Sequence, residues 1–254
     1  MNSSLIESYS LYLSKQQLIP SYPMSFIETR NQMIDWLAFL CSNLHFRLET
    51  LYQTICIFDL YISKSCPKEN LFEISNVKLI AIACLSIATK LEEINCNFLN
   101  FFTEQVLQNE FSSKMLAKKE LMILQRLNFK TNQSTCYHFL TVFQELFSNT
   151  FGKNNSQMNL YFNNLSEQFL TIAIKSDVFM SQKDIALLAV NNALMQINAC
   201  DNNNNSNNTL SFVIFGFMQQ VQQLICCNNN IKHVEYINDT YFTNSNTINP
   251  LLSL

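Results

Sequence analysis

The pattern that comes nearest to catalytic machinery is Ser75-x-x-Lys78, the spacing of a Ser/Lys hydrolase. No partner motif accompanies it, and so short a pattern recurs by chance. The histidines lie too far apart to share a zinc ion, without Cys or carboxylate neighbours at ligand spacing: His45, His138 and His233. The chain contains only two glycines, which excludes a Gly-rich phosphate loop. We therefore expect no catalytic residue, no metal site and no cofactor.

A different chemistry is indicated where a long apolar run meets Lys90, Glu92 and Glu93. The run starts at Leu79 and has no hydrophilic face before these charges. A helix that is apolar all round must be enclosed by other helices, so its charged C-terminal end is expected at the surface. The run is therefore interpreted as a core helix with a functional rim.

The composition predicts that helices position these residues. Two Gly and four Pro in 254 residues leave little for a turn-rich β architecture, and 48% hydrophobic residues are enough for a sizeable core. A short amphipathic helix is expected before Pro20 and Pro23. Apolar residues at spacings of three and four then predict five core helices: 30–45, 48–63, 77–91, 98–107 and 113–127.

The helical series begins again after a polar stretch at 131–134. Further helices are expected at these positions: 137–147, 158–174, 185–197 and 210–227. The helix IALLAVNNALMQI holds third place in its series, as the run from Leu79 does in the first series, which indicates a tandem repeat. The Asn-rich tract 201–208 can bury little apolar area and is interpreted as a surface loop. We therefore predict an all-α protein with two helical units.

Nine cysteines are an odd number, and several lie in apolar helical contexts, where a free thiol behaves as a small hydrophobe. The first thirty residues have no signal-peptide pattern, and no apolar run is long enough for a membrane span. We expect a reducing compartment, the nucleus or the cytoplasm, and no membrane partner. The net charge of −3, with Lys and Arg scattered along the chain, argues against nucleic-acid binding and favours protein partners.

Four motifs follow one another in the first half of the chain: RNQMIDWL from Arg30, IFDLYIS from Ile57, LIAIACLSIATKLEE from Leu79 and KELMILQRLNF from Lys119. Their order and spacing resemble the first box of the cyclin family, and the preceding strap from Glu7 is similar to that of A- and B-type cyclins. The resemblance implies an all-α fold of two tandem five-helix bundles preceded by a short N-terminal helix. The implied divisions are an N-terminal helix and strap at 1–29, a first box at 30–130, a second, more divergent box at 131–230 and a tail at 231–254.

The resemblance implies a regulatory subunit that binds and activates a cyclin-dependent Ser/Thr protein kinase and has no enzymatic activity of its own. Lys90 and Glu120 match the Lys and Glu by which cyclins hold main-chain groups beside the αC helix of the kinase. Leu91, Leu124 and Phe129 match apolar neighbours that would supply most of the affinity. Two alternatives remain open. Lys90 and Glu120 could form only a mutual surface ion pair, and Leu124 and Phe129 could be ordinary core residues.

Arg30 and Asp59 match a family pair that joins the first and second core helices. Either charge would be costly to bury alone, whereas a bidentate pair satisfies both. The alternative is two solvated charges at helix ends. Trp36, the single Trp, is expected to pack near this pair.

The substrate-docking patch of many cyclins is reduced here to Met33 and Trp36. Four nearby positions depart from the family pattern, two by losing an apolar side chain, one by losing an acid and one by gaining a cation: Thr29, Gln32, Phe39 and Lys78. The added cation would repel basic peptides. The resemblance therefore gives little support for recruiting substrates or inhibitors through an Arg-x-Leu motif.

Two other functions are compatible with the resemblance. One is a cyclin-fold factor in transcription, acting on polymerase as a kinase subunit or binding DNA directly, although DNA binding would need a basic face. The other is an adaptor that has the fold and activates no kinase. The sequence names neither the kinase nor the cell-cycle phase nor the substrates.

Overall fold

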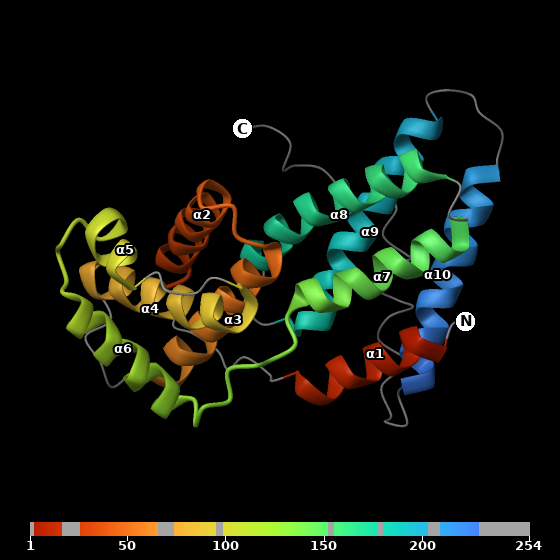
Figure 1. The fold of residues 1–254 in the computed structure, drawn as a ribbon. Helices are drawn as coiled ribbons and strands as arrows, with labels where there is room; N and C mark the ends of the chain where they lie inside the picture. The colour runs from red at the N-terminus through yellow and green to blue at the C-terminus, as the bar shows by residue number, and fades with distance from the viewer. Residues whose placement is uncertain are drawn as a thin grey trace.

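The computed structural model describes residues 3–16, 26–65, 74–94, 99–151, 155–176, 180–202 and 209–228. They form helices, with no strand among them: α1 (Ser3–Lys15), α2 (Ile27–Asn43), α3 (Leu48–Ser65), α4 (Ile74–Glu92), α5 (Leu99–Phe101), the π-helix η2 (Phe102–Val106), α6 (Ser113–Arg126), α7 (Cys136–Phe151), α8 (Ser156–Ser176), α9 (Gln182–Asn202) and α10 (Thr209–Asn228). Figure 1 shows two groups of helices side by side, α2 to α6 and α7 to α10. The all-α prediction is confirmed for the described residues.

Helix α4 lies at the centre of the first group and packs against α3, α6 and α2. Every residue from Leu79 to Thr89 is at most 5% exposed, whereas Lys90, the next residue, is exposed. Most of α3 is buried as well. The prediction that the apolar run is enclosed, and that its charged end reaches the surface, is confirmed.

The fourth helix expected in the first group has a different form from the prediction. Helix α5 is a single short turn that passes directly into η2, where the Leu107 amide donates to the Phe102 carbonyl over 2.9 Å. The Thr103 hydroxyl lies 3.2 Å from the hydroxyl of Ser113 on α6. A π-turn takes one residue more than an α-turn, and so short a segment has too few apolar positions to reveal this from spacing.

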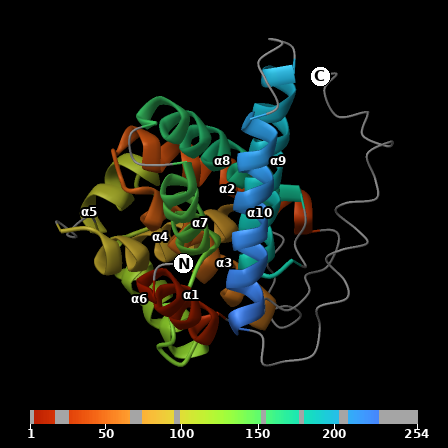
Figure 2. The same cartoon turned by 90° about the vertical axis from the view of Figure 1, so that its right-hand side faces the viewer.

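In the second group, α8 and α9 pack along each other, α7 contacts both, and α10 packs on α7 (Figure 2). Ala186, Ala189 and Ala193 of α9 are completely buried. Such small side chains allow neighbouring helices to approach closely. Phe147 of α7 stacks on Phe162 of α8 with ring centroids 3.9 Å apart. These contacts close the core of the second group.

Helix α9 continues through Asn202, so the first two residues of the Asn-rich tract are helical and the loop prediction was wrong for them. Residues 203–208 lie outside the described part of the chain. Four helices of the second group fall within the described residues, and the tail expected at 231–254 lies outside them.

Helix α1 precedes the first group in sequence but packs against α7 and α10 of the second (Figure 2). Tyr9 is completely buried, and its ring meets that of Phe139 edge-on at 5.6 Å. The Tyr12 ring lies 5.0 Å from the imidazole of His138, whose pKa is lowered by burial. The strap between α1 and α2 falls largely outside the described residues, at 17–25.

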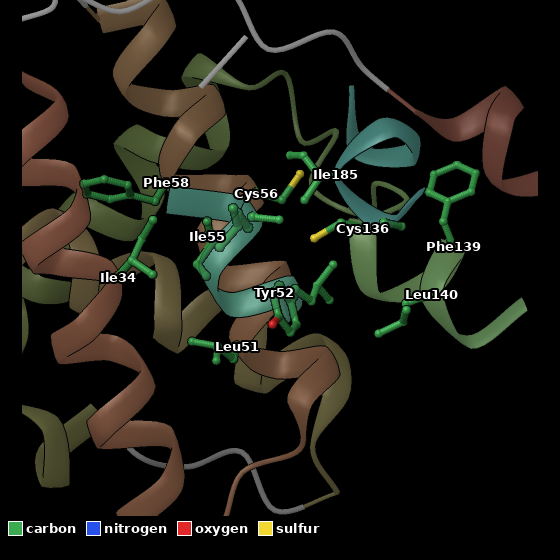
Figure 3. Packing of buried hydrophobic residues seen from close by; sticks show 14 of the residues in the cluster. Ile34, Leu51, Tyr52, Ile55, Cys56, Phe58, Cys136, Phe139, Leu140 and Ile185 are labelled. Atoms are coloured by element: carbon green, nitrogen blue, oxygen red, sulfur yellow. The ribbon is translucent and has the colours of Figure 1, made fainter. Parts of the chain in front are cut away.

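The two groups share one hydrophobic core. Figure 3 shows Cys56 of α3, Cys136 of α7 and Ile185 of α9 close together, and each is at most 4% exposed. Tyr52 of α3 stacks on Tyr137 of α7 with ring planes only 3° apart. Burial raises the pKa of the Cys56 thiol to about 12 and that of Cys136 further. These thiols are therefore protonated at neutral pH and pack as small hydrophobes, as expected.

Candidate partner-binding surface

The charged end of α4 lies against α6, where Lys90 and Glu120 form an ion pair. The Lys90 ammonium nitrogen is 2.7 and 2.9 Å from the two carboxylate oxygens of Glu120. The Lys90 side chain is 42% exposed and that of Glu120 is 10% exposed. In this chain alone the two residues therefore bind each other, and a pair this open to solvent contributes only about 0–1 kcal/mol to stability.

Apolar residues follow this pair along α4, α6 and the ends of both helices, and their exposure separates surface residues from core residues. Leu91 and Phe129 are 45% and 64% exposed, whereas Leu124 is partly buried against the core. Two further exposed residues were not assigned to the site from sequence: Ile94, three residues beyond Leu91 and past the end of α4, and Leu121, the residue after the glutamate of the pair. They are 99% and 49% exposed. We call the following residues the rim surface: Lys90, Leu91, Ile94, Glu120, Leu121, Leu124 and Phe129.

Spacing gave no signal for either residue: the periodicity of the helix at 113–127 predicted that Leu121 faces inward, and this is wrong, because Leu121 is 49% exposed. Exposure is what distinguishes them from core leucines and isoleucines, and exposure depends on which helix covers them. Exposed apolar residues on two packed helices that also carry a charged pair are typical of a protein-binding surface.

The chain leaves α6 in a conformation that holds Phe129 outward. Asn128 and Phe129 have φ angles of 51° and 58°, in the left-handed region. The Phe129 amide donates to the Leu124 carbonyl over 2.7 Å and that of Asn128 to Gln125 over 3.0 Å, which closes the helix end. A bulky residue in this region is unfavourable and persists only where its surroundings enforce it. The strained backbone therefore lies at Phe129, the most exposed apolar residue of α6 and the segment that follows it.

Hydrogen bonds anchor the end of α4 to the start of α3. The Glu93 carboxylate accepts the backbone N–H of Arg47 at 2.9 Å and the hydroxyl of Thr50 at 2.5 Å. The Arg47 guanidinium in turn donates to the Glu92 carbonyl over 3.0 Å. Helix N-terminal N–H groups lack intrahelical partners and favour a nearby carboxylate. This network fixes the backbone that directly follows the rim lysine.

Arg30 and Asp59 form the expected bidentate pair. The alternative, that they are two solvated charges at helix ends, is wrong. The guanidinium donates to both Asp59 carboxylate oxygens over 2.9 and 2.8 Å, and the two side chains are 3% and 2% exposed. Arg30 also donates to the Ile174 carbonyl at 2.9 Å, and Asn31 to that of Lys175 at 3.3 Å. The pair therefore holds the end of α8 as well as joining α2 to α3, a contact that sequence reasoning missed.

The residues of the reduced docking patch do not form an open apolar surface. Met33 is only 6% exposed, and Trp36 is partly buried against the core. Phe39, on the same helix, is 63% exposed. Asp35 forms an ion pair with Lys175 of α8 at 2.7 Å. Met33 consequently offers little area to a peptide, and Trp36 offers part of a ring.

Within the described residues, His, Cys, Asp and Glu form no group of three or more that could hold a metal ion. None of the helices described is long and apolar enough to cross a membrane. The rim surface offers hydrogen-bond donors, acceptors and apolar area, which is the chemistry of a protein interface rather than of a reaction centre.

Comparison with known proteins identifies relatives of this chain. Residues 2–132 match the family described as "Cyclin, N-terminal domain". The G2/mitotic-specific cyclin-B of Spisula solidissima is 28% identical over 150 residues, which cover 55% of this chain and 34% of that protein. Cyclin-B1-2 of Arabidopsis thaliana is 32% identical over 149 residues, or 54% and 31% of the two chains.

The G2/mitotic-specific cyclin-4 of Saccharomyces cerevisiae is 36% identical over 105 residues, which cover 40% of this chain and 21% of that protein. The matched stretches thus span about a third or less of these relatives. The family match covers half of the chain and includes the Arg30–Asp59 pair and every residue of the rim surface. The chain therefore belongs to the cyclin family.

Proposed function

We propose that the chain is a regulatory subunit that forms a heterodimer with a cyclin-dependent Ser/Thr protein kinase and activates it in cell-cycle control. The observation that carries the proposal is the rim surface, in which the Lys90–Glu120 pair and exposed apolar residues lie on the packed helices α4 and α6 and at their ends. The family supports a kinase partner in general, and relatives named G2/mitotic-specific cyclins support a role in cell division. The subunit itself catalyses no reaction.

In this proposal the Lys90–Glu120 pair opens to bind the kinase main chain. The Lys90 ammonium group donates to backbone carbonyls, and the Glu120 carboxylate accepts backbone N–H groups beside the αC helix of the kinase. Because Glu120 is held in place by burial in α6, it presents its carboxylate in a defined position. Leu91 and Phe129 supply apolar contact area, and an interface of this class buries on the order of 2,000 Å² or more.

Activation would follow from differential binding to two states of the kinase. The active state has the kinase's own Lys–Glu ion pair formed and its activation segment opened. A rigid rim surface that fits the αC helix in that state, and fits the inactive state less well, shifts the population towards activity. The kinase performs the phosphoryl transfer.

The proposal assigns separate roles to the two halves of the chain. The first box, 30–130, carries the kinase contact, and the second box, 131–230, supports it through the shared core and the Arg30 contact to α8. The N-terminal helix and strap, 1–29, precede the first box. The heterodimer would act in the nucleus or the cytoplasm.

The test is to purify the chain with each of a panel of cyclin-dependent kinases and to measure both the affinity and the phosphorylation of histone. Lys90→Ala/Glu120→Ala is expected to weaken binding by tenfold or more, because two charge-assisted contacts are lost. The matched control is Asp35→Ala/Lys175→Ala, which removes an ion pair of the same length away from the rim surface. The control should bind and activate like the wild type.

Failure of the wild-type chain to bind or activate any kinase would contradict the proposal. Binding without activation would instead identify an adaptor. Equal affinities for the two double variants would remove Lys90 and Glu120 from the interface while leaving the function standing.

A further inference from the structure

Helix α10 has an outer side that carries no charge. Its 20 residues include no Lys, Arg, Asp or Glu, whereas each of the other described helices of ten or more residues carries at least one. A helix at a protein surface normally turns charged residues towards water. The buried centres of protein interfaces, by contrast, are depleted of charged residues. In composition, α10 therefore resembles a helix from an interface.

Four residues that are exposed among the described residues form a single stripe along this outer side. We call them the α10 stripe: Phe215, Gln219, Gln222 and Cys226. Their steps of four, three and four residues place them within about 60° of one another around the helix axis. Phe217 points to the other side of α10, where its ring meets that of Phe147 on α7. Steps of three and four residues are the spacing at which two helices pack along each other.

Gly216 lies beside Phe215, at the edge of the α10 stripe. Outside its own helical turn, no atom of the described residues lies within 4 Å of the place that a Cβ atom would take. Contacts among these residues therefore do not require a glycine here, although glycine inside a helix is destabilising relative to alanine. A glycine does allow another backbone to approach closely. This observation is independent of charge and also points to a chain that packs against α10.

We propose that the α10 stripe packs antiparallel against the same stripe of a second copy of this chain, which forms a two-fold symmetric dimer. Steps of four, three and four residues read the same in both directions. An antiparallel copy therefore brings Phe215 opposite Cys226 of the second copy, and Gln219 opposite its Gln222. A glutamine amide both donates and accepts hydrogen bonds, so two opposed glutamines satisfy each other. The Phe215 ring packs on the thiol in a favourable sulfur–aromatic contact.

A second copy fits the α10 stripe better than a charged partner does. A charged side chain buried against the stripe would lose its hydration without meeting an opposite charge. The same stripe of a second copy brings no charge, and a two-fold interface uses one patch twice. Because the stripe is only about 16 Å long, the interface is small, and the dimer is expected to dissociate in the micromolar range.

The dimer leaves the rim surface of each copy open. Helix α10 lies at the opposite end of the molecule from α6 in Figure 1, and it faces the viewer in Figure 2. Each copy can therefore bind a partner through its rim surface while α10 joins the two copies. The inference goes beyond the proposed kinase function and does not depend on it.

The test is analytical ultracentrifugation of the full chain at protein concentrations from micromolar to submillimolar, where a monomer–dimer equilibrium is expected. Gln222→Glu should weaken the association by tenfold or more, because a carboxylate would be buried with no cation opposite it. The matched control is Gln168→Glu, the same change at an exposed position of α8, which should associate like the wild type. Lys90→Ala/Glu120→Ala should also associate normally, which separates this result from the kinase proposal.

Two further variants test the identity and the direction of the partner helix. In a mixture of Gln222→Glu with Gln219→Lys, antiparallel stripes bring the new carboxylate of one copy opposite the new ammonium group of the other. The mixture should therefore associate more tightly than either variant does with itself. Gly216→Ala should weaken the association and raise the urea midpoint of the monomer, because alanine favours the helix while its methyl group hinders close approach.

A monomer at every concentration would overturn the proposal. Equal association of the Gln222→Glu and Gln168→Glu variants would also overturn it, as would a mixture that associates no better than its components. If the chain stays monomeric and Gln222→Glu accelerates proteolysis of residues 231–254, the tail of the same chain covers the stripe in place of a second copy.

Discussion

At the residue scale, Arg30 donates to both carboxylate oxygens of Asp59 and to the carbonyl oxygen of Ile174, as well as to the side-chain oxygen of Asn31. Its charge is satisfied in a site that solvent does not reach. Lys90 makes a contact with Glu120 that is just as short, but much of its side chain faces solvent. The same bond length therefore has two consequences. Burial makes the first pair structural, and exposure leaves the second available to a partner.

Arg30→Met is expected to lower the free energy of unfolding by about 3–5 kcal/mol, because it leaves the Asp59 carboxylate buried and uncompensated. Urea denaturation measures this change. The matched control is Lys175→Met, which breaks the exposed ion pair with Asp35 and should cost less than about 1 kcal/mol. Similar losses in the two variants would contradict the distinction between buried and exposed pairs.

At the scale of elements, the two helix ends that carry the rim surface are held in different ways. The end of α4 is tied to the start of α3 by the carboxylate of Glu93. The end of α6 is closed by backbone bonds through two residues with positive φ, which direct Phe129 outward. Both arrangements order the backbone before a partner arrives, and such preorganisation lowers the entropic cost of binding.

Glu93→Ala is expected to lower the free energy of unfolding by about 1 kcal/mol, because the Arg47 amide and the Thr50 hydroxyl lose their acceptor at a helix N-terminus. Hydrogen exchange of the Arg47 amide should accelerate, and the affinity for the kinase should fall although Lys90 is unchanged. Glu93→Gln retains an acceptor oxygen and should keep most of the wild-type protection. If the two variants exchanged at the same rate, this side-chain oxygen could not be what holds the end of α4.

At the scale of the whole molecule, the two helical groups behave as one packed body. Cys56, Cys136 and Ile185 come from helices of both groups and meet in one core (Figure 3). Arg30 crosses the same boundary by a buried hydrogen bond, and α1 packs on the second group although it precedes the first. Neither group could be removed without exposing apolar surface of the other.

We therefore expect both groups to unfold in one transition. Trp36, the single Trp, reports on the first group by fluorescence, whereas far-UV circular dichroism reports on all helices. Urea denaturation followed by the two signals should have the same midpoint, the usual test of cooperative unfolding. Two separate midpoints would indicate that the shared core does not couple the groups.

The sequence predicted some residues of the candidate site but not the full set of residues that form its surface. Lys90 and Glu120 were proposed as site residues because the motifs that contain them resemble the cyclin family in order and spacing, and these are properties of the chain itself. Leu124 and Phe129 could not be separated into core and surface, and only the structure places Leu124 partly inside and leaves Phe129 64% exposed. Ile94 was missed for the same reason. The spacing of apolar residues does not show whether one that follows two glutamates is buried or exposed.

By itself, the sequence determined the order and type of nearly all the helices, the enclosed run from Leu79 and its charged end, because periodicity and composition act locally along the chain. Tertiary structure alone decided the π-turn at Phe102, the bond from Arg30 to α8 and which apolar residues of α6 remain exposed. Those features depend on which helix covers which side of its neighbours. That arrangement follows from contacts between residues far apart in sequence, which no local pattern records.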